Sequence, residues 1–393
     1  MLQTPVSPPN RPHMDGVPAS LHLLNTVAED VRGITKTIMK EFEIPGAIVS
    51  VRVASEPVVE FAMGSSTRQD EHEIQPMLMD YSFRIGSVTK SMTATVILLL
   101  IQDNYLGLND TIDHWFPQYP NAKKITIRYL LNMTSGLGDY ENTDKFERIF
   151  AKDPLLHWNT DDLVRWARDA KPNFNPGEGW KYCNTNYVLL GRIIEQIMQL
   201  PLHDVFESIL FRPLGMQETF LATDGEWRGK SHARGYGVFR APEHDIEDCT
   251  AWNPTWGWSA GGVISNVEDM HRWAVNLGHS TLLNHFGRTR WLLNPMLDQS
   301  AISVPVKNRP AFEENVFFYA FGVVFDEGWV YHSGSIPGFE TMCAHHPELG
   351  ISIVLSVNQT TLPKFNAGNS SVMHLFKRIA RLLTVNVPPL HID

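Results

Sequence analysis

The chain has 393 residues, of which 43% are hydrophobic and 10% aromatic, and its 43 acidic and 33 basic residues give a formal net charge of −10. This composition is that of a folded globular protein, and the length favours two structural units over one. The sequence holds no cluster of basic residues interleaved with aromatic ones, so we expect no nucleic-acid partner.

The N-terminal residues 1–20 carry several prolines and no apolar segment, which predicts a flexible tail and not a signal peptide. No later stretch reaches the roughly 20 apolar residues that a membrane-spanning helix needs. The cysteines Cys183, Cys249 and Cys343 are odd in number and far apart, so they indicate neither a disulfide framework nor a zinc site. We therefore expect a cytoplasmic protein with no membrane partner, no metal and no cofactor.

The first part of the chain predicts a helix, a strand hairpin and a second helix. The hydrophobic spacing indicates, in chain order, a helix at 21–42, strands at 47–53 and 58–62, an extended piece at 81–84 and a helix that begins at Ser87. The stretch 94–101 of this last helix is apolar on every side, which predicts a helix inside the protein.

From about residue 107 to 258 the pattern becomes helical, and strands return near the C-terminus. The clearest elements are helices at 126–131, 159–170, 187–200 and 267–277, strands at 317–325, 329–332, 341–345 and 351–357, and a helix at 372–383. This order predicts an α/β (α+β) fold in which both chain ends form an antiparallel sheet flanked by helices, with a mostly helical domain inserted. We assign 21–105 and 259–393 to the sheet domain and 106–258 to the helical domain, and we expect a site in the cleft between them.

Ser87 lies three residues before Lys90 at the start of the buried helix. On a helix, residues at this spacing share one face, and the helix N-terminus favours a developing negative charge. A serine hydroxyl needs a neighbouring base to act as a nucleophile, and a lysine can serve if burial lowers its pKa. The spacing is common, so on this stretch alone a helix cap followed by a solvated lysine is the favoured interpretation.

Two further short patterns bear on Ser87. Tyr182 and Asn184 precede the helix at 187–200, where the tyrosine hydroxyl could enter a cleft and the amide could hold substrate or the lysine. His332 and Gly334 end a predicted strand, and Gly334 would let the backbone N–H of Ser335 approach a reacting carbonyl. Each pattern alone also fits a structural role, as a core tyrosine with a capping asparagine and as a tight turn with a satisfied histidine.

Together and in this order, the three patterns are similar to the motifs of the serine β-lactamase and penicillin-binding protein family. The resemblance is greatest to the branch with Tyr-x-Asn and His-x-Gly, which holds class C β-lactamase-like esterases, D-Ala-D-Ala carboxypeptidases of the Streptomyces type and D-aminopeptidases. It extends over roughly residues 21–383. Three further stretches also resemble the family, at 83–86, 213–216 and 259–262.

The resemblance implies a serine hydrolase that forms a covalent acyl-enzyme. Ser87 would attack an ester or amide carbonyl, and Lys90 and Tyr182 would share the general base and acid work. The N–H groups of Ser87 and Ser335 would form the oxyanion hole. Asn184 and His332 would orient the substrate and the proton network, and Gly334 would let the strand backbone come close to the reacting carbonyl.

The sequence departs from the family pattern in places. Cys183 stands where the family usually has Ser or Ala, and Met133 replaces a histidine in the stretch 130–137. His332 in place of lysine weakens the usual cation for a β-lactam carboxylate, which argues against a dedicated β-lactamase. We expect a small ester, thioester or amide instead, with a bulky or apolar group suggested by the aromatic residues Trp180, Trp252, Trp256, Trp258 and Phe339.

Four alternatives remain open. The acyl-enzyme could pass its acyl group to another alcohol or amine, as in acyltransferases of secondary metabolism. Ser259 lies in a Gly-x-Ser-x-Gly pattern typical of α/β-hydrolases, although no buried strand precedes it and the next predicted helix starts only near Asn266. The chain could also be a catalytically inactive relative that binds a ligand. A metal site at His345 and His346 is disfavoured because neighbouring strand residues point to opposite faces.

Overall fold

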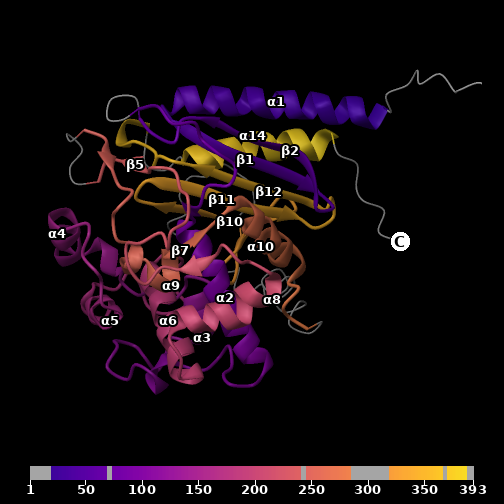
Figure 1. Ribbon diagram of the computed structural model, residues 1–393. Coiled ribbons are helices and arrows are strands. Elements are labelled where there is room, and N and C mark those ends of the chain that lie inside the picture. Colours follow the sequence, from indigo (N-terminus) through magenta and orange to yellow (C-terminus); the bar gives the residue numbers. More distant parts are fainter. Residues whose placement is uncertain (1–18, 69–72, 240–244, 285–317, 366–369, 387–393) are drawn as a thin grey trace, which may run out of the picture.

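The structure is a computed structural model that describes residues 19–68, 73–239, 245–284, 318–365 and 370–386 (Figure 1). It contains a large antiparallel sheet with helices on both faces, and a mostly helical part beneath the sheet (Figure 1). The α/β fold with an antiparallel sheet flanked by helices, predicted from the sequence, is therefore confirmed.

The large sheet has seven strands in the order β2-β1-β12-β11-β10-β9-β8. Their bounds are β1 Gly46–Val53, β2 Glu56–Gly64, β8 Phe318–Tyr319, β9 Val324–Asp326, β10 Trp329–Ile336, β11 Phe339–His346 and β12 Ile351–Val357. The first hairpin joins the C-terminal strands through β1 and β12, where Val49 lies opposite Leu355. Both chain ends thus form one sheet, as the strand patterns indicated.

Two predicted strands differ from the observed ones. The stretch predicted as one strand at 317–325 contains two short strands, β8 and β9, separated by a turn at Gly322, whose φ is +75°. Residue 317 lies outside the described residues. The strand predicted at 329–332 continues to Ile336, because β10 pairs with β11 through a tight hairpin. This extension brings Gly334 and Ser335 into the sheet.

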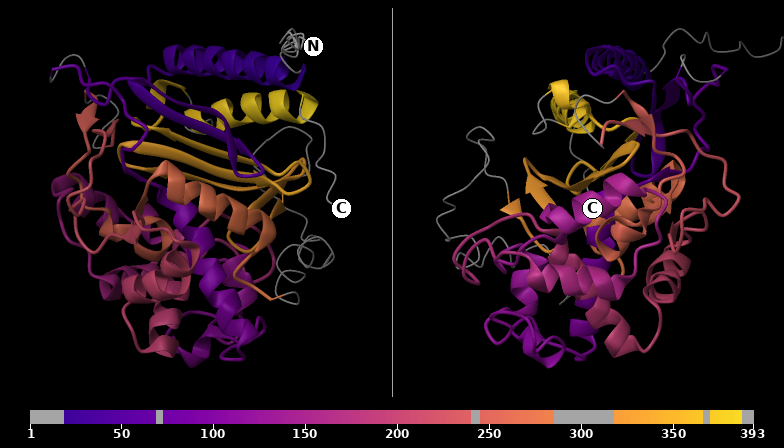
Figure 2. Two further views of the ribbon diagram at one scale, coloured as in Figure 1. Left: turned by 45° about the vertical axis from the view of Figure 1, so that its right-hand side comes forward. Right: turned by 90° about the vertical axis from the view of Figure 1, so that its left-hand side faces the viewer.

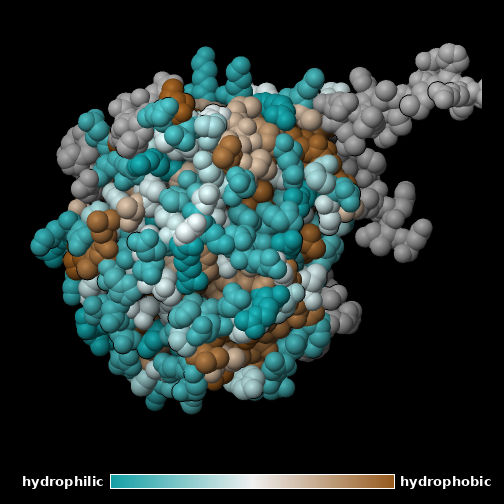
Figure 3. Space-filling model, in the orientation of Figure 1, coloured by the Kyte–Doolittle hydropathy of each residue, from teal (hydrophilic) through white to brown (hydrophobic). Residues whose placement is uncertain are grey.

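Terminal helices cover one face of the sheet and α10 covers the other (Figure 2). Helices α1 (Ala19–Glu41) and α14 (Ser371–Asn386) lie side by side and enclose a core with the strands that includes Val31, Ile353 and Phe376. Helix α10 (Val267–His279) packs against β11 and β12 on the opposite face. Hydrophilic side chains cover most of the face seen in Figure 3, with apolar areas between them.

The segment between the two parts of the sheet is mostly helical. Its helices are α2 Thr89–Gln102, α3 Ile127–Leu131, α4 Asp144–Lys152, α5 Thr160–Asp169, α6 Asn184–Met198, α7 Leu202–Phe206, α8 Arg212–Leu214 and α9 Trp258–Gly261, with a π-helical turn at Glu207–Phe211. Short 3₁₀ turns lie in this segment at η1 Gly86–Val88, η2 Ile112–His114, η3 Tyr140–Asn142 and η5 Pro254–Trp256, and a further one, η6 Pro363–Phe365, follows β12.

Short strands fix the segment before α2 against the rest of the chain. One small sheet has the order β3-β7-β4, with bounds Phe83–Arg84, Val263–Ser265 and Phe220–Leu221, and a second pairs β5 (Tyr236–Gly237) with β6 (Glu247–Asp248). Arg84 on β3 is buried and donates to the carbonyl oxygens of Cys249, Thr250 and Trp252. These bonds hold the start of η1 at a fixed position beneath the large sheet.

Candidate active site

Ser87 lies in the 3₁₀ turn η1, one residue from the start of α2, and Lys90 is the second residue of α2. The sequence placed Ser87 on the α-helix itself, so the helix begins two residues later than expected. The spacing still brings the two side chains together: Lys90 Nζ donates to Ser87 Oγ at 2.9 Å. Ser87 is partly exposed, whereas its neighbours Gly86 and Val88 are buried, so the hydroxyl is the accessible group of the turn.

Lys90 is fully buried because α2 is apolar on nearly every side. Its ammonium has few partners: it donates to the carbonyl oxygen of Ala260 at 2.8 Å and lies 4.8 Å from the centre of the Tyr182 ring. Burial in this environment disfavours the charged form and lowers the pKa of Lys90 from 10.5 to about 8. A lysine with this pKa can accept a proton from a serine near neutral pH.

Tyr182 lies on the loop immediately before α6 and hydrogen-bonds with Ser87. Burial raises the pKa of the Tyr182 phenol well above 10, so the hydroxyl carries its proton at neutral pH. The phenol and the ammonium therefore approach the same serine oxygen. Together they form the short proton-transfer chain that the sequence motifs suggested.

Glycines let β10 approach η1 closely. A Cβ atom on Gly334 would lie 1.9 Å from the carbonyl oxygen of Ile85 and 3.0 Å from the backbone nitrogen of Ser87. A Cβ atom on Gly86, whose φ is +50°, would lie 2.8 Å from the backbone nitrogen of Ser335. The backbone nitrogens of Ser87 and Ser335 thus lie at the same crossing, where two N–H donors could stabilise an oxyanion.

His332 is buried on β10, which lies between β9 and β11 in the large sheet, and its two ring nitrogens have different neighbours. Nδ1 lies 2.6 Å from the carbonyl oxygen of Ser333, and Nε2 lies 3.2 Å from the hydroxyl of Tyr319. Burial, and then the charge of Lys90, lowers the pKa of His332 to about 3. The ring is therefore neutral at physiological pH.

Asn184 is the first residue of α6 and is partly buried. Its backbone N–H donates to Asp139 Oδ2 at 2.8 Å, so an acidic side chain occupies the N-terminus of α6. Burial raises the pKa of Asp139, and burial followed by the charge of Asp139 raises that of Glu141. The sequence analysis did not single out these two carboxyl groups, because nothing in their spacing connects them with Lys90.

Ser259 differs from Ser87 in its surroundings. It is completely buried in the short helix α9, which the sequence did not predict, and its hydroxyl donates to the carbonyl oxygen of Tyr187 at 2.9 Å. A Cβ atom on Gly191 would lie 2.4 Å from Ser259 Oγ, so α6 packs directly against this hydroxyl. Ser259 therefore joins α9 to α6 and cannot be reached by a substrate, while the next residue, Ala260, supplies the carbonyl that contacts Lys90.

The aromatic residues expected near the site have different positions. Trp180 contacts Tyr319 with ring centres 6.0 Å apart. Trp252 and Trp256 instead pack against Phe150 on α4, and Phe339 packs against Trp227. The side chain of Trp258 lies near Gly191 on α6. Trp180 therefore contacts the Tyr319 ring that also lies against Tyr182 and His332. The other aromatic side chains make their contacts with different residues.

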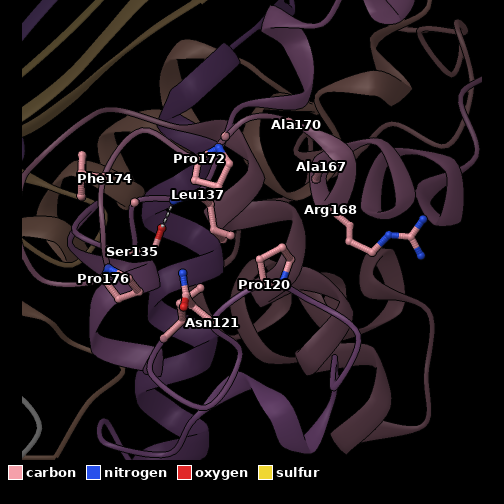
Figure 4. A pocket seen from close by; sticks show the side chains of 13 residues that line it. Pro120, Asn121, Ser135, Leu137, Ala167, Arg168, Ala170, Pro172, Phe174 and Pro176 are labelled. Atoms are coloured by element: carbon pink, nitrogen blue, oxygen red, sulfur yellow. Dashed lines mark hydrogen bonds between the residues drawn. The ribbon is translucent and has the colours of Figure 1, made fainter.

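A separate pocket lies in the helical part (Figure 4). Its lining comprises Pro120, Asn121, Ile125, Ser135, Gly136, Leu137, Gly138, Ala167, Arg168, Ala170, Pro172, Phe174 and Pro176. Ser135 accepts a hydrogen bond from the backbone N–H of Leu137 and donates to Asn186, so its polar atoms are already engaged. The lining includes none of the residues of the three motifs.

Comparison with known proteins identifies the family. A family model described as Beta-lactamase matches residues 31–376. The chain belongs to the Beta-lactamase family. The resemblance inferred from the three motifs is thereby confirmed, and the members to which the chain is similar include amidases, esterases and penicillin-binding proteins.

The chain matches different shares of its relatives in this family. Penicillin-binding protein 4* of Bacillus subtilis (strain 168) is 36% identical over 152 residues, which are 37% of this chain and 32% of that protein. Unguisins hydrolase ungD' of Aspergillus campestris (strain IBT 28561) is 27% identical over 367 residues, or 89% of this chain and 65% of that protein. The chain thus spans less than two thirds of the length of these two relatives.

A solved structure covers nearly the whole chain. The D-amino acid amidase from Ochrobactrum anthropi SV3, complexed with D-phenylalanine, is 25% identical, with a TM-score of 0.75 over 92% of this chain and 99% of that one. In the part of the chain that the structure describes, no helix has the length and apolar character needed to cross a membrane. The same residues contain no group of three or more His, Cys, Asp or Glu side chains that could hold a metal ion.

Proposed function

We propose that the chain is a serine hydrolase that acts through an acyl-enzyme on Ser87, with a small ester, thioester or amide as substrate. The observation that carries the proposal is the 2.9 Å contact between Ser87 Oγ and the fully buried Lys90 Nζ. A buried lysine with a lowered pKa beside an accessible serine is the combination that nucleophilic catalysis requires.

Acylation starts with neutral Lys90, which takes the proton of the Ser87 hydroxyl as Oγ attacks the carbonyl carbon. The carbonyl oxygen gains negative charge and is stabilised by the N–H groups of Ser87 and Ser335 at the crossing of η1 and β10. As the bond to the leaving oxygen, sulfur or nitrogen breaks, Tyr182 gives that atom a proton and recovers one from Lys90. Water, activated by the same groups, then cleaves the acyl-serine and releases the acid.

The substrate proposal rests on similarity and on the aromatic residues beside the site. Likeness to the D-amino acid amidase over nearly the whole chain supports an amino acid amide as one substrate class. Contact of Trp180 with Tyr319 beside the site supports a bulky or apolar group on the substrate. Asn184 and His332 would orient this substrate, and we retain acyl transfer to another alcohol or amine as the second outcome of the same acyl-enzyme.

Two broader expectations belong to the same proposal. We propose that residues 21–105 and 259–393 form a sheet domain and 106–258 a helical domain, with the site between them, since Ser87 and His332 come from the first and Tyr182 from the second. We also propose a cytoplasmic location, supported by the three cysteines, which are buried and form no disulfide bond.

A fluorophosphonate probe tests the nucleophile directly, because only the attacking oxygen retains the phosphonyl group. We expect peptide mass spectrometry to find the label on Ser87 in the wild-type protein and no label in Ser87→Ala. Ser259→Ala is the matched control and should still carry the label on Ser87. Label on Ser259 in the wild-type protein, or labelling of Ser87→Ala at the wild-type rate, would refute the proposal.

A further inference from the structure

The neighbours of His332 determine which ring nitrogen carries the proton. A carbonyl oxygen can only accept, so the 2.6 Å contact between Nδ1 and the Ser333 carbonyl requires the proton on Nδ1. Nε2 of the neutral ring then holds a lone pair, and the Tyr319 hydroxyl at 3.2 Å is positioned to donate to it. Both nitrogens are thus engaged within the protein.

Tyr319 occupies the junction between the second and third motifs. Its ring lies edge-on to the rings of His332 and Tyr182, with centres 5.7 and 6.0 Å apart, and 6.0 Å from that of Trp180. The turn that follows β8 is equally constrained, because a Cβ atom on Gly322 would lie 2.9 Å from the carbonyl oxygen of Lys90. The Tyr319 ring is therefore held against both motifs by the element that carries it.

We propose that Tyr319 is a positioning residue that keeps His332 as a neutral ring with its proton on Nδ1, and that the site in consequence selects substrates with no carboxylate beside the scissile bond. The inference rests on the proposed function, because the substrate is assumed to react at Ser87. Among the residues that the structure describes, the charged or titratable groups that face His332 are Lys90, Tyr182 and Tyr319.

The charge balance explains the selection. A carboxylate loses its hydration when it enters a buried site, and it needs a cation or several donors in return. His332 offers neither, since one nitrogen already donates and the other accepts. Lys90 has to be neutral to accept the Ser87 proton, so its pairing with a substrate carboxylate would hold it in the charged, inactive form. An uncharged ester or amide carries no such penalty.

Nitrogen NMR of the full chain labelled with ¹⁵N-histidine tests the tautomer. The His332 signals are assigned by their loss in His332→Gln, and we expect the wild-type ring to be neutral with the proton on Nδ1 at pH 7. Tyr319→Phe removes the hydroxyl that contacts Nε2 and that also hydrogen-bonds with Tyr187, and it should shift the ring several-fold toward the Nε2–H tautomer. Tyr331→Phe is the matched control: Tyr331 precedes His332 on β10 but packs against Phe376 on the opposite face of the sheet, and its loss should leave the tautomer unchanged.

A matched pair of esters tests the selection. p-Nitrophenyl butyrate and mono-p-nitrophenyl succinate differ in a terminal methyl group against a carboxylate, and the faster spontaneous hydrolysis of the succinate, which its own carboxylate assists, is subtracted as an enzyme-free rate. We expect the wild-type protein and Tyr331→Phe to favour the butyrate in kcat/KM, and Tyr319→Phe to narrow that preference several-fold. His332→Lys, which supplies a cation, should narrow it further.

The two experiments separate this proposal from the proposed function. A His332 ring that is charged or protonated on Nε2 in the wild-type protein overturns the role of Tyr319, whether or not Ser87 is the nucleophile. An unchanged ester preference in folded Tyr319→Phe and His332→Lys overturns the selection. Turnover of the esters by Ser87→Ala at the wild-type rate would instead refute the role of Ser87 and leave the tautomer result standing.

Discussion

The pH dependence of acylation should follow the protonation of Lys90. Ser87 can lose its proton to Lys90 only when the lysine is neutral, and burial places this change at a pKa of about 8. Below that value the rate constant of acylation should rise about tenfold per pH unit, and above it the rate should level off. The relevant substrate is a neutral p-nitrophenyl ester, whose own charge does not change over this range.

The size of the effect follows from the shift. At pH 7 a lysine with a pKa of about 8 is neutral in about one molecule in ten, against about one in 3,000 for a pKa of 10.5. Burial of Lys90 therefore raises the population of the reactive form about 300-fold, which corresponds to about 3 kcal/mol of free energy. The same free energy disfavours the charged lysine in the folded protein, so the site holds its base at a cost in stability.

Glu141→Gln tests the assignment of this pKa to Lys90. The charge of Glu141 is the largest influence that raises the Lys90 pKa against burial, so its removal should move the midpoint of the profile to lower pH. Glu147→Gln, at an exposed acidic residue of α4, is the matched control and should leave the midpoint in place. Stopped-flow release of p-nitrophenol measures the acylation step. A flat profile between about pH 6 and 9, or a midpoint that rises in Glu141→Gln, would refute the reasoning.

Three further changes have definite expected outcomes. Tyr182→Phe should keep its thermal unfolding midpoint and lose about 10² to 10⁴ in kcat, since the ring remains and the proton donor is gone; near wild-type turnover would remove Tyr182 from the mechanism. Gly334→Ala should separate β10 from η1, because its Cβ would lie 1.9 Å from the Ile85 carbonyl oxygen, and phosphonate labelling of Ser87 should slow at least about tenfold; an unchanged rate would contradict the oxyanion site. His345, whose pKa burial lowers to about 3, binds its proton more readily in the unfolded chain, so stability should fall as pH drops from about 6.5 to 3 by up to about 1.4 kcal/mol per unit. In urea unfolding, His345→Gln should show a smaller loss over this range, and an equal loss would exclude His345 as a source.

The sequence allowed the prediction of elements with strong periodicity and of motifs whose chemistry is local. The contact between Ser87 and Lys90 depends on one turn of backbone, so spacing alone could predict it. Tyr319 could not be found in this way. It lies on β8 and contacts Tyr182, a residue distant in the sequence, as well as His332, so the contacts exist only in the folded chain. The burial of Ser259 was equally invisible, because a Gly-x-Ser-x-Gly pattern does not reveal that α6 lies against the hydroxyl.

When the site is ready to react, its charges favour the transition state over the tight binding of a charged substrate. Tyr182 and His332 are neutral at physiological pH, and Lys90 has to give up its charge before Ser87 can react. In that reactive form, none of these three side chains carries a full positive charge that could bind an anion tightly. The N–H groups of Ser87 and Ser335 are fixed at the crossing of η1 and β10, and they become most effective when negative charge develops on the carbonyl oxygen. Because these donors stabilise the oxyanion more than the neutral carbonyl, their contribution lowers the barrier instead of strengthening the binding of substrate.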